Sequence, residues 1–332
     1  MILTAASEIY ARAARWRRRW YSARPSRQRR LSHPVISVGN LRVGGAGKTP
    51  LVAAIARILI ARGERPDILS RGYARKAGGY VVVADEHQVL APIESAGDEP
   101  LMLARELKGV PVVVGADRFT SGRIAEQRFA TTVHLLDDGF QHLELARDVD
   151  LVVADEIDLN DKVLPAGRLR EPLSVAAVAD AMLTTAAPED VERLRQATGL
   201  DSVFRVARTL GAPVAFLGDR SRQLTRGPAF AFAGIARPEN FFDELTRSGW
   251  TLTGTKRFSD HHWFSASDLA HVERAARSSG AEIVLTTEKD RQRLEQFTVE
   301  HVTVAAVPLE VTIEPSFEDW LLDRLAARRQ RA

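Results

Sequence analysis

A glycine-rich loop that ends in a lysine and a threonine is the part of this chain best suited to do chemistry. It lies in VISVGNLRVGGAGKTP, residues 35–50, where an apolar run gives way to glycines. Glycines let backbone N–H groups turn inward around phosphate oxygens, and the N-terminus of a following helix attracts the same anion. The pattern therefore predicts a nucleotide-phosphate site formed by Gly44, Gly45, Ala46, Gly47, Lys48 and Thr49.

Within this loop, Lys48 and Thr49 have separate predicted roles. The lysine of a phosphate loop reaches the β- and γ-phosphates, and the hydroxyl that follows it is a ligand of Mg²⁺. The match to the standard pattern G-x-x-x-x-G-K-[ST] is imperfect, because Arg42 stands at the position of its first glycine. The form G-G-x-G-K-T resembles the loop of some dimeric ATPases, but those carry a lysine where this chain has Val43.

A pair of carboxylates is the second candidate part of this site. In TVHLLDDGFQH an apolar strand ends in Asp137 and Asp138. Carboxylates at the carboxyl end of such a strand face the crevice where phosphates bind. Asp-Asp-Gly is also favourable turn chemistry, so a solvated turn is the alternative. With a phosphate loop upstream, we expect at least one of the two carboxylates to hold the metal together with Thr49.

The predicted nucleotide is ATP. A GTPase usually carries an Asn/Thr-Lys-x-Asp motif that reads the base, and the nearest stretch here is TTEKD, in which Lys289 and Asp290 are adjacent. Because that spacing is wrong for guanine recognition, we expect ATP and Mg²⁺ as the cofactors of this chain.

These residues require a sheet with helices packed on it. Strand-like runs and helical patterns alternate after His33, which favours an α/β fold with a P-loop NTPase-like, largely parallel sheet and helices on both faces. The expected strands lie at 35–38, 67–69, 80–84, 111–115, 132–137 and 150–154, and the expected helices at 50–61, 99–108 and 117–130.

The second half reads as a smaller α/β unit. The pattern loosens near 200–225, which looks like paired strands that link two halves, and further strands and helices follow up to the helix FEDWLLDRLAARRQ. We therefore divide the chain into a basic amphipathic arm at 1–30, a P-loop domain at 31–205, and a smaller α/β domain at 206–332.

The N-terminal arm is strongly basic and has helical periodicity. Nine arginines lie between Arg12 and Arg30, and no acidic residue occurs between Glu8 and Glu64. One apolar stripe recurs at steps of four and three and consists of Ile2, Ala6, Ile9, Ala13, Trp16 and Trp20. An apolar face with aromatics and flanking arginines is typical of a helix in a membrane interface, so we expect an anionic membrane surface as a partner. A helix docked on the protein's own core is the alternative, and nucleic acid is the least favoured partner.

Composition limits the remaining classes. The 332 residues are 45% hydrophobic and 27% charged, with a net charge of +3, which is typical of a globular protein of two domains. The lack of cysteine excludes disulfides, zinc thiolates and cysteine nucleophiles, and indicates a reducing cytoplasm. No apolar run approaches the roughly 20 residues of a spanning helix, and no signal-peptide core is present. We expect a peripheral protein on the cytoplasmic side, without an obligate protein partner.

Several motifs together resemble one enzyme family, tetraacyldisaccharide 4'-kinase, the lipid A 4'-kinase. They run in order from about residue 33 to 290 and are SVGNLRVGGAGKTP, LSRGY, GDEP, DRF, LLDDGFQH, LPAGRLREP, FSDHHWF and TTEKD. The resemblance implies transfer of the γ-phosphate of ATP to the 4'-hydroxyl of a tetraacylated glucosamine disaccharide 1-phosphate. It also implies a peripheral position on the cytoplasmic face of the Gram-negative inner membrane, and residues 31–205 as the kinase domain.

The resemblance also implies roles for individual residues. Asp98 of GDEP matches the proposed base, paired with His261 of DHH, which would accept the proton of the attacking hydroxyl. Because this pair joins the two halves, the resemblance implies that the domain at 206–332 closes over the site. Without the family, Asp98 would be read as an acid at a helix start and His261 as a loop histidine. Arg118 and Arg170 match residues near the phosphates, where guanidinium groups suit developing charge. The positions that match the lipid-headgroup site are Asn40, Tyr73 and Glu171.

Two other functions stay open from the residues alone. A membrane-associated switch ATPase of the partitioning or targeting type would share the glycine loop and an amphipathic helix. The missing lysine at Val43 and the long second half with its DHH motif argue against it. A non-catalytic basic module that binds RNA or DNA is supported only by the arginine arm.

Overall fold

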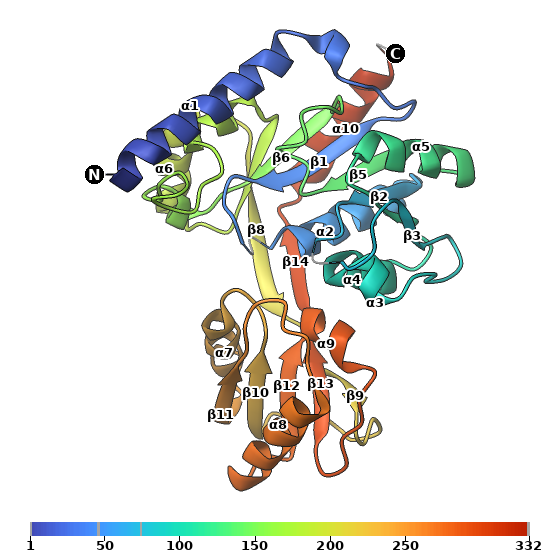
Figure 1. The fold of residues 1–332 in the computed structure, drawn as a ribbon, viewed down its shortest axis with the longest axis vertical. Coiled ribbons are helices and arrows are strands. Elements are labelled where there is room, and N and C mark those ends of the chain that lie inside the picture. Colours follow the sequence, from blue (N-terminus) through green and yellow to red (C-terminus); the bar gives the residue numbers. More distant parts are fainter. Residues whose placement is uncertain (1, 45–46, 74, 331–332) are drawn as a thin grey trace.

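The computed structural model describes residues 2–44, 47–73 and 75–330. Gly45 and Ala46, two of the predicted phosphate-loop residues, lie outside the described residues. The chain forms a large α/β unit and a smaller one, joined by two strands, β8 (Val203–Leu210) and β14 (Leu309–Ile313) (Figure 1).

The large sheet has nine strands in the order β14-β8-β7-β6-β1-β5-β2-β4-β3. Pairing is parallel from β8 through β4, and the edge strands β14 and β3 are antiparallel to their neighbours. The other strands are β1 (Val35–Asn40), β2 (Pro66–Ser70), β3 (Val81–Ala84), β4 (Val112–Val114), β5 (Val133–Asp137), β6 (Val149–Val153) and β7 (Ala181–Thr184).

Both faces of this sheet are covered, which explains the nearly continuous apolar strands. On β1, Ile36 and Val38 face one core and Val35 faces the other. The first core is packed by α2 (Lys48–Ala61), α4 (Asp98–Glu106) and α10 (Ser316–Arg329). The opposite face carries α5 (Arg118–Arg128) and α6 (Pro188–Thr198), with the short helices η2 (Glu156–Asp158) and η3 (Leu173–Val178). The predicted α/β fold with helices on both faces of a largely parallel sheet is confirmed.

The small unit is built around a five-stranded sheet in the order β11-β10-β12-β13-β9. Only β9 is antiparallel to its neighbour. Its strands are β9 (Val214–Leu217), β10 (Pro228–Ala233), β11 (Thr251–Arg257), β12 (Ile283–Thr287) and β13 (Thr303–Val307), and its helices are α7 (Pro238–Arg247), α8 (Ala266–Ser278) and α9 (Glu288–Leu294). One core lies against α8 and α9 and the other against α7, so this unit also has three layers.

The C-terminal segment differs from the expected division at 206–332. β14 pairs with β8 at the edge of the large sheet, and α10 packs Phe317, Leu321 and Leu325 into the core of the large unit. Ion pairs reinforce this position, including Arg329 with Glu64 at 2.7 Å. The periodicity of FEDWLLDRLAARRQ identifies a helix, but it contains no information about which core the helix joins.

Helix α1 (Ile2–Ser22) lies against the large unit (Figure 1), and the residues that it buries there are not those of the predicted stripe. Ser7, Ala11 and Arg18 are buried, and their spacing of four and seven places them on one side of the helix. Ile9 and Trp16 lie on the opposite side and are 69% and 67% exposed. The helix therefore docks on the protein's own large unit, as in the expected alternative, but through another face, and Ile9, Ala13 and Trp16 of the stripe are exposed.

A buried charge cluster lies at the amino ends of the central strands β2 and β5, which are the strand ends away from the phosphate loop. The ring of His134 contacts Asp67 at 2.9 Å and Glu126 at 3.4 Å, and Glu126 also accepts the backbone N–H of Ser32. Burial disfavours the charged ring, but the two carboxylates outweigh it and raise the pKa of His134 to about 9. Burial likewise opposes ionisation of Glu126, but the contacts with His134 and Ser32 lower its pKa to about 2.

This cluster makes stability depend on pH. The folded pKa of His134 is above its ordinary value, so its stabilisation is present below that value and is lost as pH rises through about 9. We expect the free energy of unfolding to fall by roughly 1–3 kcal/mol between neutral pH and pH 10. Urea unfolding across that range, with His134→Gln as the matched variant, checks this, and equal pH slopes in the two proteins would contradict it.

Candidate active site

The phosphate loop connects β1 to α2. Gly47 precedes the helix with φ +67°, a conformation that favours glycine. A Cβ at this position would also lie 2.8 Å from the guanidinium carbon of Arg208, which comes from the linking strand β8. The link between the two units therefore reaches the phosphate loop itself, and this neighbour was not found from the sequence.

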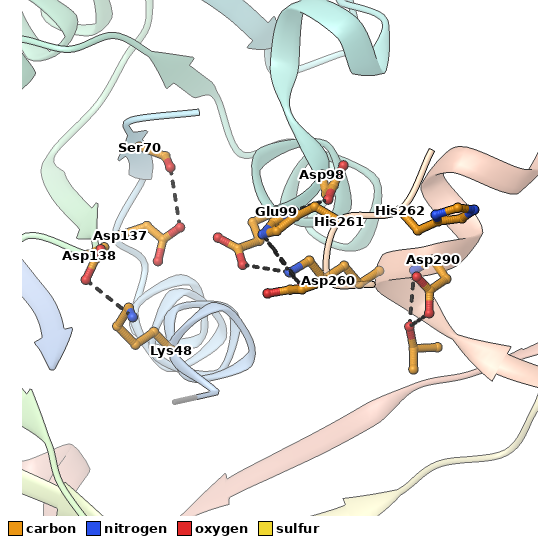
Figure 2. A network of polar contacts seen from close by, with 12 residues as sticks. Lys48, Ser70, Asp98, Glu99, Asp137, Asp138, Asp260, His261, His262 and Asp290 are labelled. Carbon is orange, nitrogen blue, oxygen red and sulfur yellow. Dashed lines mark hydrogen bonds and ion pairs between the residues drawn. The ribbon is translucent and has the colours of Figure 1, made fainter. Parts of the chain in front are cut away.

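Lys48, the first residue of α2, points toward Asp138, which follows β5 (Figure 2). Its Nζ donates to Asn40 Oδ1 at 2.9 Å and lies 3.3 Å from Asp138 Oδ1. Asn40 is buried, and its amide nitrogen donates to the carbonyl of Arg42 at 2.8 Å. In this structure Asn40 therefore positions Lys48, whereas the family resemblance implied a contact with the lipid headgroup.

The two carboxylates at the end of β5 have different environments. Burial raises the pKa of Asp137 to about 7, with the charge of Glu99 adding to the effect. Burial also acts to raise the pKa of Asp138, but Lys48 and Arg170 outweigh it and hold the pKa below its ordinary value. At neutral pH the pair therefore provides one firmly ionised carboxylate and one that titrates near neutrality.

The donors at this point suit a magnesium ion bound mainly by phosphates. Thr49 and Asp138 line the same cavity, and the Oδ1 atom of Asp138 is buried with Lys48 Nζ at 3.3 Å, so this carboxylate lies beside the lysine of the phosphate loop. Among residues 2–44, 47–73 and 75–330, no cluster of three or more His, Cys, Asp or Glu side chains could hold a metal by itself. Mg²⁺ usually takes one or two carboxylates together with phosphate oxygens, so Thr49 with Asp138, and Asp137 beside it, fit that coordination.

Arg170 contacts the carboxylate oxygen of Asp138 that Lys48 does not contact. Its Nη1 atom lies 3.0 Å from Asp138 Oδ2 and 2.9 Å from Gln141 Oε1. The amide of Gln141 donates in turn to the backbone carbonyl of Asn40 at 2.9 Å. The segments after β1 and β5 and the loop at 168–171 are thus joined by hydrogen bonds around one carboxylate.

Asp98 and His261 meet across the two units, although 163 positions separate them (Figure 2). Asp98 is the first residue of α4, and the Nδ1 atom of His261 lies 2.8 Å from its Oδ2. The guanidinium of Arg293, from α9 of the small unit, contacts the same oxygen. Both side chains of that ion pair are almost fully buried, with 1% of Arg293 and 3% of Asp98 exposed.

The opposite edge of the His261 ring faces a second charged group. Lys289 Nζ lies 3.3 Å from His261 Nε2 and 3.5 Å from both Glu99 and Asp260 (Figure 2). Glu99 belongs to the large unit and the other members to the small unit. The interface between the units is therefore polar and carries charges of both signs.

Backbone strain occurs at two of these positions. Among the described residues, Asp138 with φ 55° and His261 with φ 58° are the non-glycine residues with positive φ. Such conformations cost of order 1–3 kcal/mol each and cluster at functional sites. One strained residue, Asp138, lies beside the phosphate loop, and the other, His261, belongs to the pair with Asp98. Their positions indicate that the functional site lies at the interface between the units.

A cavity of about 1110 Å³ lies between the two units. Its walls include groups from both units, among them Lys48, Thr49, Asp138, Arg170, His261 and Lys289. Asp98 does not line the cavity and lies one hydrogen bond behind His261. The site is therefore assembled only when the small unit contacts the large one.

Of the remaining predicted residues, Tyr73 and Glu171 line the cavity and Arg118 does not. Tyr73 lines the cavity with its ring 5.5 Å from that of His261. Glu171 also borders the cavity, but its carboxylate is bound by Arg18 of α1. Arg118 is buried behind the cavity wall and donates to the carbonyls of Gly115 and Ala116. Burial lowers the pKa of Arg118 to about 10.

Comparisons with known proteins agree on one family. A family model described as Tetraacyldisaccharide-1-P 4'-kinase matches residues 1–326. The tetraacyldisaccharide 4'-kinase of Desulfotalea psychrophila is 38% identical over 335 residues, which cover 97% of this chain and 95% of that protein. The tetraacyldisaccharide 4'-kinase of Pelobacter propionicus is 41% identical over 300 residues, which cover 88% and 82%.

A solved structure extends the similarity to the fold. LpxK from Aquifex aeolicus, described as an "apo" form in complex with ATP, is 32% identical and superposes with a TM-score of 0.78, covering 98% of this chain and 97% of its own. With a family match over nearly the whole chain and relatives of this identity and coverage, the chain belongs to the tetraacyldisaccharide-1-P 4'-kinase family and is a kinase of lipid A synthesis.

Proposed function

We propose that the cavity between the two units binds ATP and the headgroup of a tetraacylated glucosamine disaccharide 1-phosphate, and transfers the γ-phosphate to the 4'-hydroxyl. A bond forms between the 4'-oxygen and the γ-phosphorus while the bond to the β–γ bridging oxygen breaks, so that ADP leaves. The observation that carries this proposal is the meeting of a phosphate loop with the Asp98–His261 pair across one cavity. One side of the cavity holds phosphates and the other can accept a proton.

On the phosphate side, the chain supplies charge at fixed positions. Lys48 is held by Asn40 and is placed to bind the β- and γ-phosphates, and Arg170 is placed to bind the transferring group. When bound by Thr49 and Asp138, Mg²⁺ would neutralise charge on the β- and γ-phosphate oxygens. Arg118 lies behind the two aspartates and adds positive charge without reaching the cavity.

On the acceptor side, the hydroxyl proton passes to the Asp98–His261 pair. His261 forms the cavity wall, and Asp98 lies behind the ring where its negative charge favours proton uptake. Arg293 occupies the same oxygen of Asp98 and compensates a buried charge that would otherwise be costly. Tyr73 stands beside His261 and is placed to contact the sugar.

Closure of the small unit is part of this proposal. His261, Arg293 and Lys289 belong to the small unit, whereas Asp98 and Glu99 belong to the large one. Closing the interface brings these groups together and excludes water from the transferring phosphate. We therefore propose residues 31–205, with the returning segment Leu309–Arg329, as the kinase domain and the remainder of the second half as the closing domain.

A substrate analogue tests the acceptor position. We expect label from γ-labelled ATP to enter the tetraacyl disaccharide 1-phosphate and to be absent from its 4'-deoxy analogue. The two lipids share every other group, so the comparison isolates the attacking hydroxyl. Labelling of the 4'-deoxy lipid at a comparable rate would show that another hydroxyl is the acceptor.

We also propose that α1 binds the anionic cytoplasmic face of the inner membrane as a peripheral helix. None of the helices among the described residues is long and apolar enough to cross a bilayer. The exposed stripe around Ile9 and Trp16 is flanked by exposed Arg12 and Arg19, a pattern suited to an interface with anionic lipids. This surface requires neither nucleic acid nor an obligate protein partner.

Removing Trp16 should weaken membrane binding without altering chemistry. Trp16→Ala is expected to lower binding to phosphatidylethanolamine vesicles that contain phosphatidylglycerol by about tenfold, because a large apolar side chain no longer leaves water. The turnover number in detergent should not change. Vesicle sedimentation measures the first effect, and undiminished sedimentation of this variant would remove the outward stripe from the membrane contact.

A further inference from the structure

Three consecutive arginines in α1 have different surroundings. Arg17 and Arg19 are exposed, whereas Arg18 is 5% exposed. A charged side chain in the interior must be matched by partners that offset the loss of water. Arg18 lies on the side of α1 opposite Trp16, so one helix presents an apolar stripe outward and a buried cation inward.

Arg18 contacts two segments of the large unit at once. Its Nε and Nη2 atoms donate to the two oxygens of Glu171 at 2.8 and 2.7 Å. The Nη2 atom also donates to the backbone carbonyl of Phe140 at 3.0 Å, and the guanidinium lies 4.3 Å from the centre of the Phe140 ring. Only a planar fork makes both contacts with Glu171 in this geometry, so lysine could replace the charge but not the arrangement.

Both segments hold residues of the phosphate site. Phe140 comes two positions after Asp138, and Glu171 follows Arg170 directly. Arg170 contacts Asp138 at 3.0 Å, so the two segments held by Arg18 also meet at the candidate metal ligand. The segment after Phe140 continues through Gln141 to the carbonyl of Asn40, the residue whose side chain binds Lys48.

We propose that Arg18 is a positioning residue for phosphoryl transfer, which couples the seating of α1 to the geometry of Asp138 and Arg170. This inference rests on the proposed function. Arg18 does not touch the phosphates and acts through Glu171 and the Phe140 carbonyl. One face of α1 therefore binds the membrane, and the opposite face fixes the positions of Asp138 and Arg170. Glu171 contributes by accepting the two hydrogen bonds from Arg18.

The test separates the two faces of α1. In detergent, Arg18→Ala is expected to lower kcat for lipid phosphorylation by about 10–100-fold, because small displacements of positioned groups cost that much. The dissociation constant of Mg·ATP, measured by titration calorimetry without lipid, should rise several-fold. Binding to vesicles of phosphatidylethanolamine and phosphatidylglycerol should stay at the wild-type level. Arg15→Ala, at another exposed position of α1, should keep kcat and Mg·ATP binding unchanged.

The activity of Arg18→Ala and of Arg18→Lys decides whether the Arg18 contact positions the phosphate site. Wild-type kcat and wild-type Mg·ATP binding in folded Arg18→Ala would overturn it, since the contact would then be structural only. If Arg18→Ala does not fold, Arg18→Lys keeps the charge but loses the fork, and a fall in kcat with normal thermal stability would support the proposal, whereas normal kcat would overturn it. If wild-type protein does not phosphorylate the lipid, the proposed function fails, and Mg·ATP binding still tests Arg18.

Discussion

Asp98→Asn is expected to lower kcat for lipid phosphorylation by about 10²–10⁴-fold, the range for loss of a general base. The affinity for Mg·ATP should change little, because Asp98 lies behind His261 and away from the phosphate loop. His261→Ala should likewise lower turnover far more than ATP affinity. Steady-state kinetics combined with nucleotide titration measures both quantities.

The double variant provides the control for this prediction. If Asp98 and His261 act as one unit, Asp98→Asn combined with His261→Ala should be no slower than the worse single variant. Multiplied losses would mean that the two residues act independently. Unchanged turnover in His261→Ala would remove that residue from the mechanism.

Lys48→Ala is expected to abolish measurable transfer, with a loss of at least about 10²–10³-fold, because a cation directed at developing phosphate charge is removed. The loss should be larger than that of Asn40→Ala, which leaves the lysine but removes the amide that holds it at 2.9 Å. Initial rates at saturating Mg·ATP make the comparison. Equal rates for Lys48→Ala and wild type would contradict the assignment of the phosphate loop.

Much of the fold and the phosphate side could be predicted from the sequence, because local patterns determine them. Apolar strands followed by glycine, proline or capping residues predicted β1, β5 and α2, and the structure has them at Val35–Asn40, Val133–Asp137 and Lys48–Ala61. The proposed roles of Lys48, Thr49 and Asp138 were inferred from the order of strand, loop and helix, and these side chains line one cavity.

The other side of the site depends on contacts between distant segments. No local pattern predicts that Arg293 reaches Asp98, at a separation of 195 positions, or that Arg18 reaches Glu171. The contacts of Asn40 and Glu171 could not be predicted for the same reason, since their partners Lys48 and Arg18 lie on helices that the sequence does not orient. The sequence shows that Arg18 is a basic residue of a predicted helix, but it does not show that this side chain is buried.

Backbone strain at the site could not be predicted from the sequence either. Asp138 and His261 adopt positive φ although neither is glycine, and such conformations persist only where the surrounding contacts enforce them. For α1, the apolar stripe could be predicted from the sequence. The separate docking face, which has small residues at Ser7 and Ala11, could not be predicted.

The most direct test of the central claim follows the γ-phosphate of ATP. Purified protein in detergent would be incubated with γ-labelled ATP, Mg²⁺ and the tetraacyl disaccharide 1-phosphate, beside the Lys48→Ala variant, and lipid and water-soluble products would be separated. We predict label in the lipid fraction with wild-type protein and none with Lys48→Ala. Label found only in free phosphate would contradict the lipid kinase and favour a membrane-associated switch ATPase.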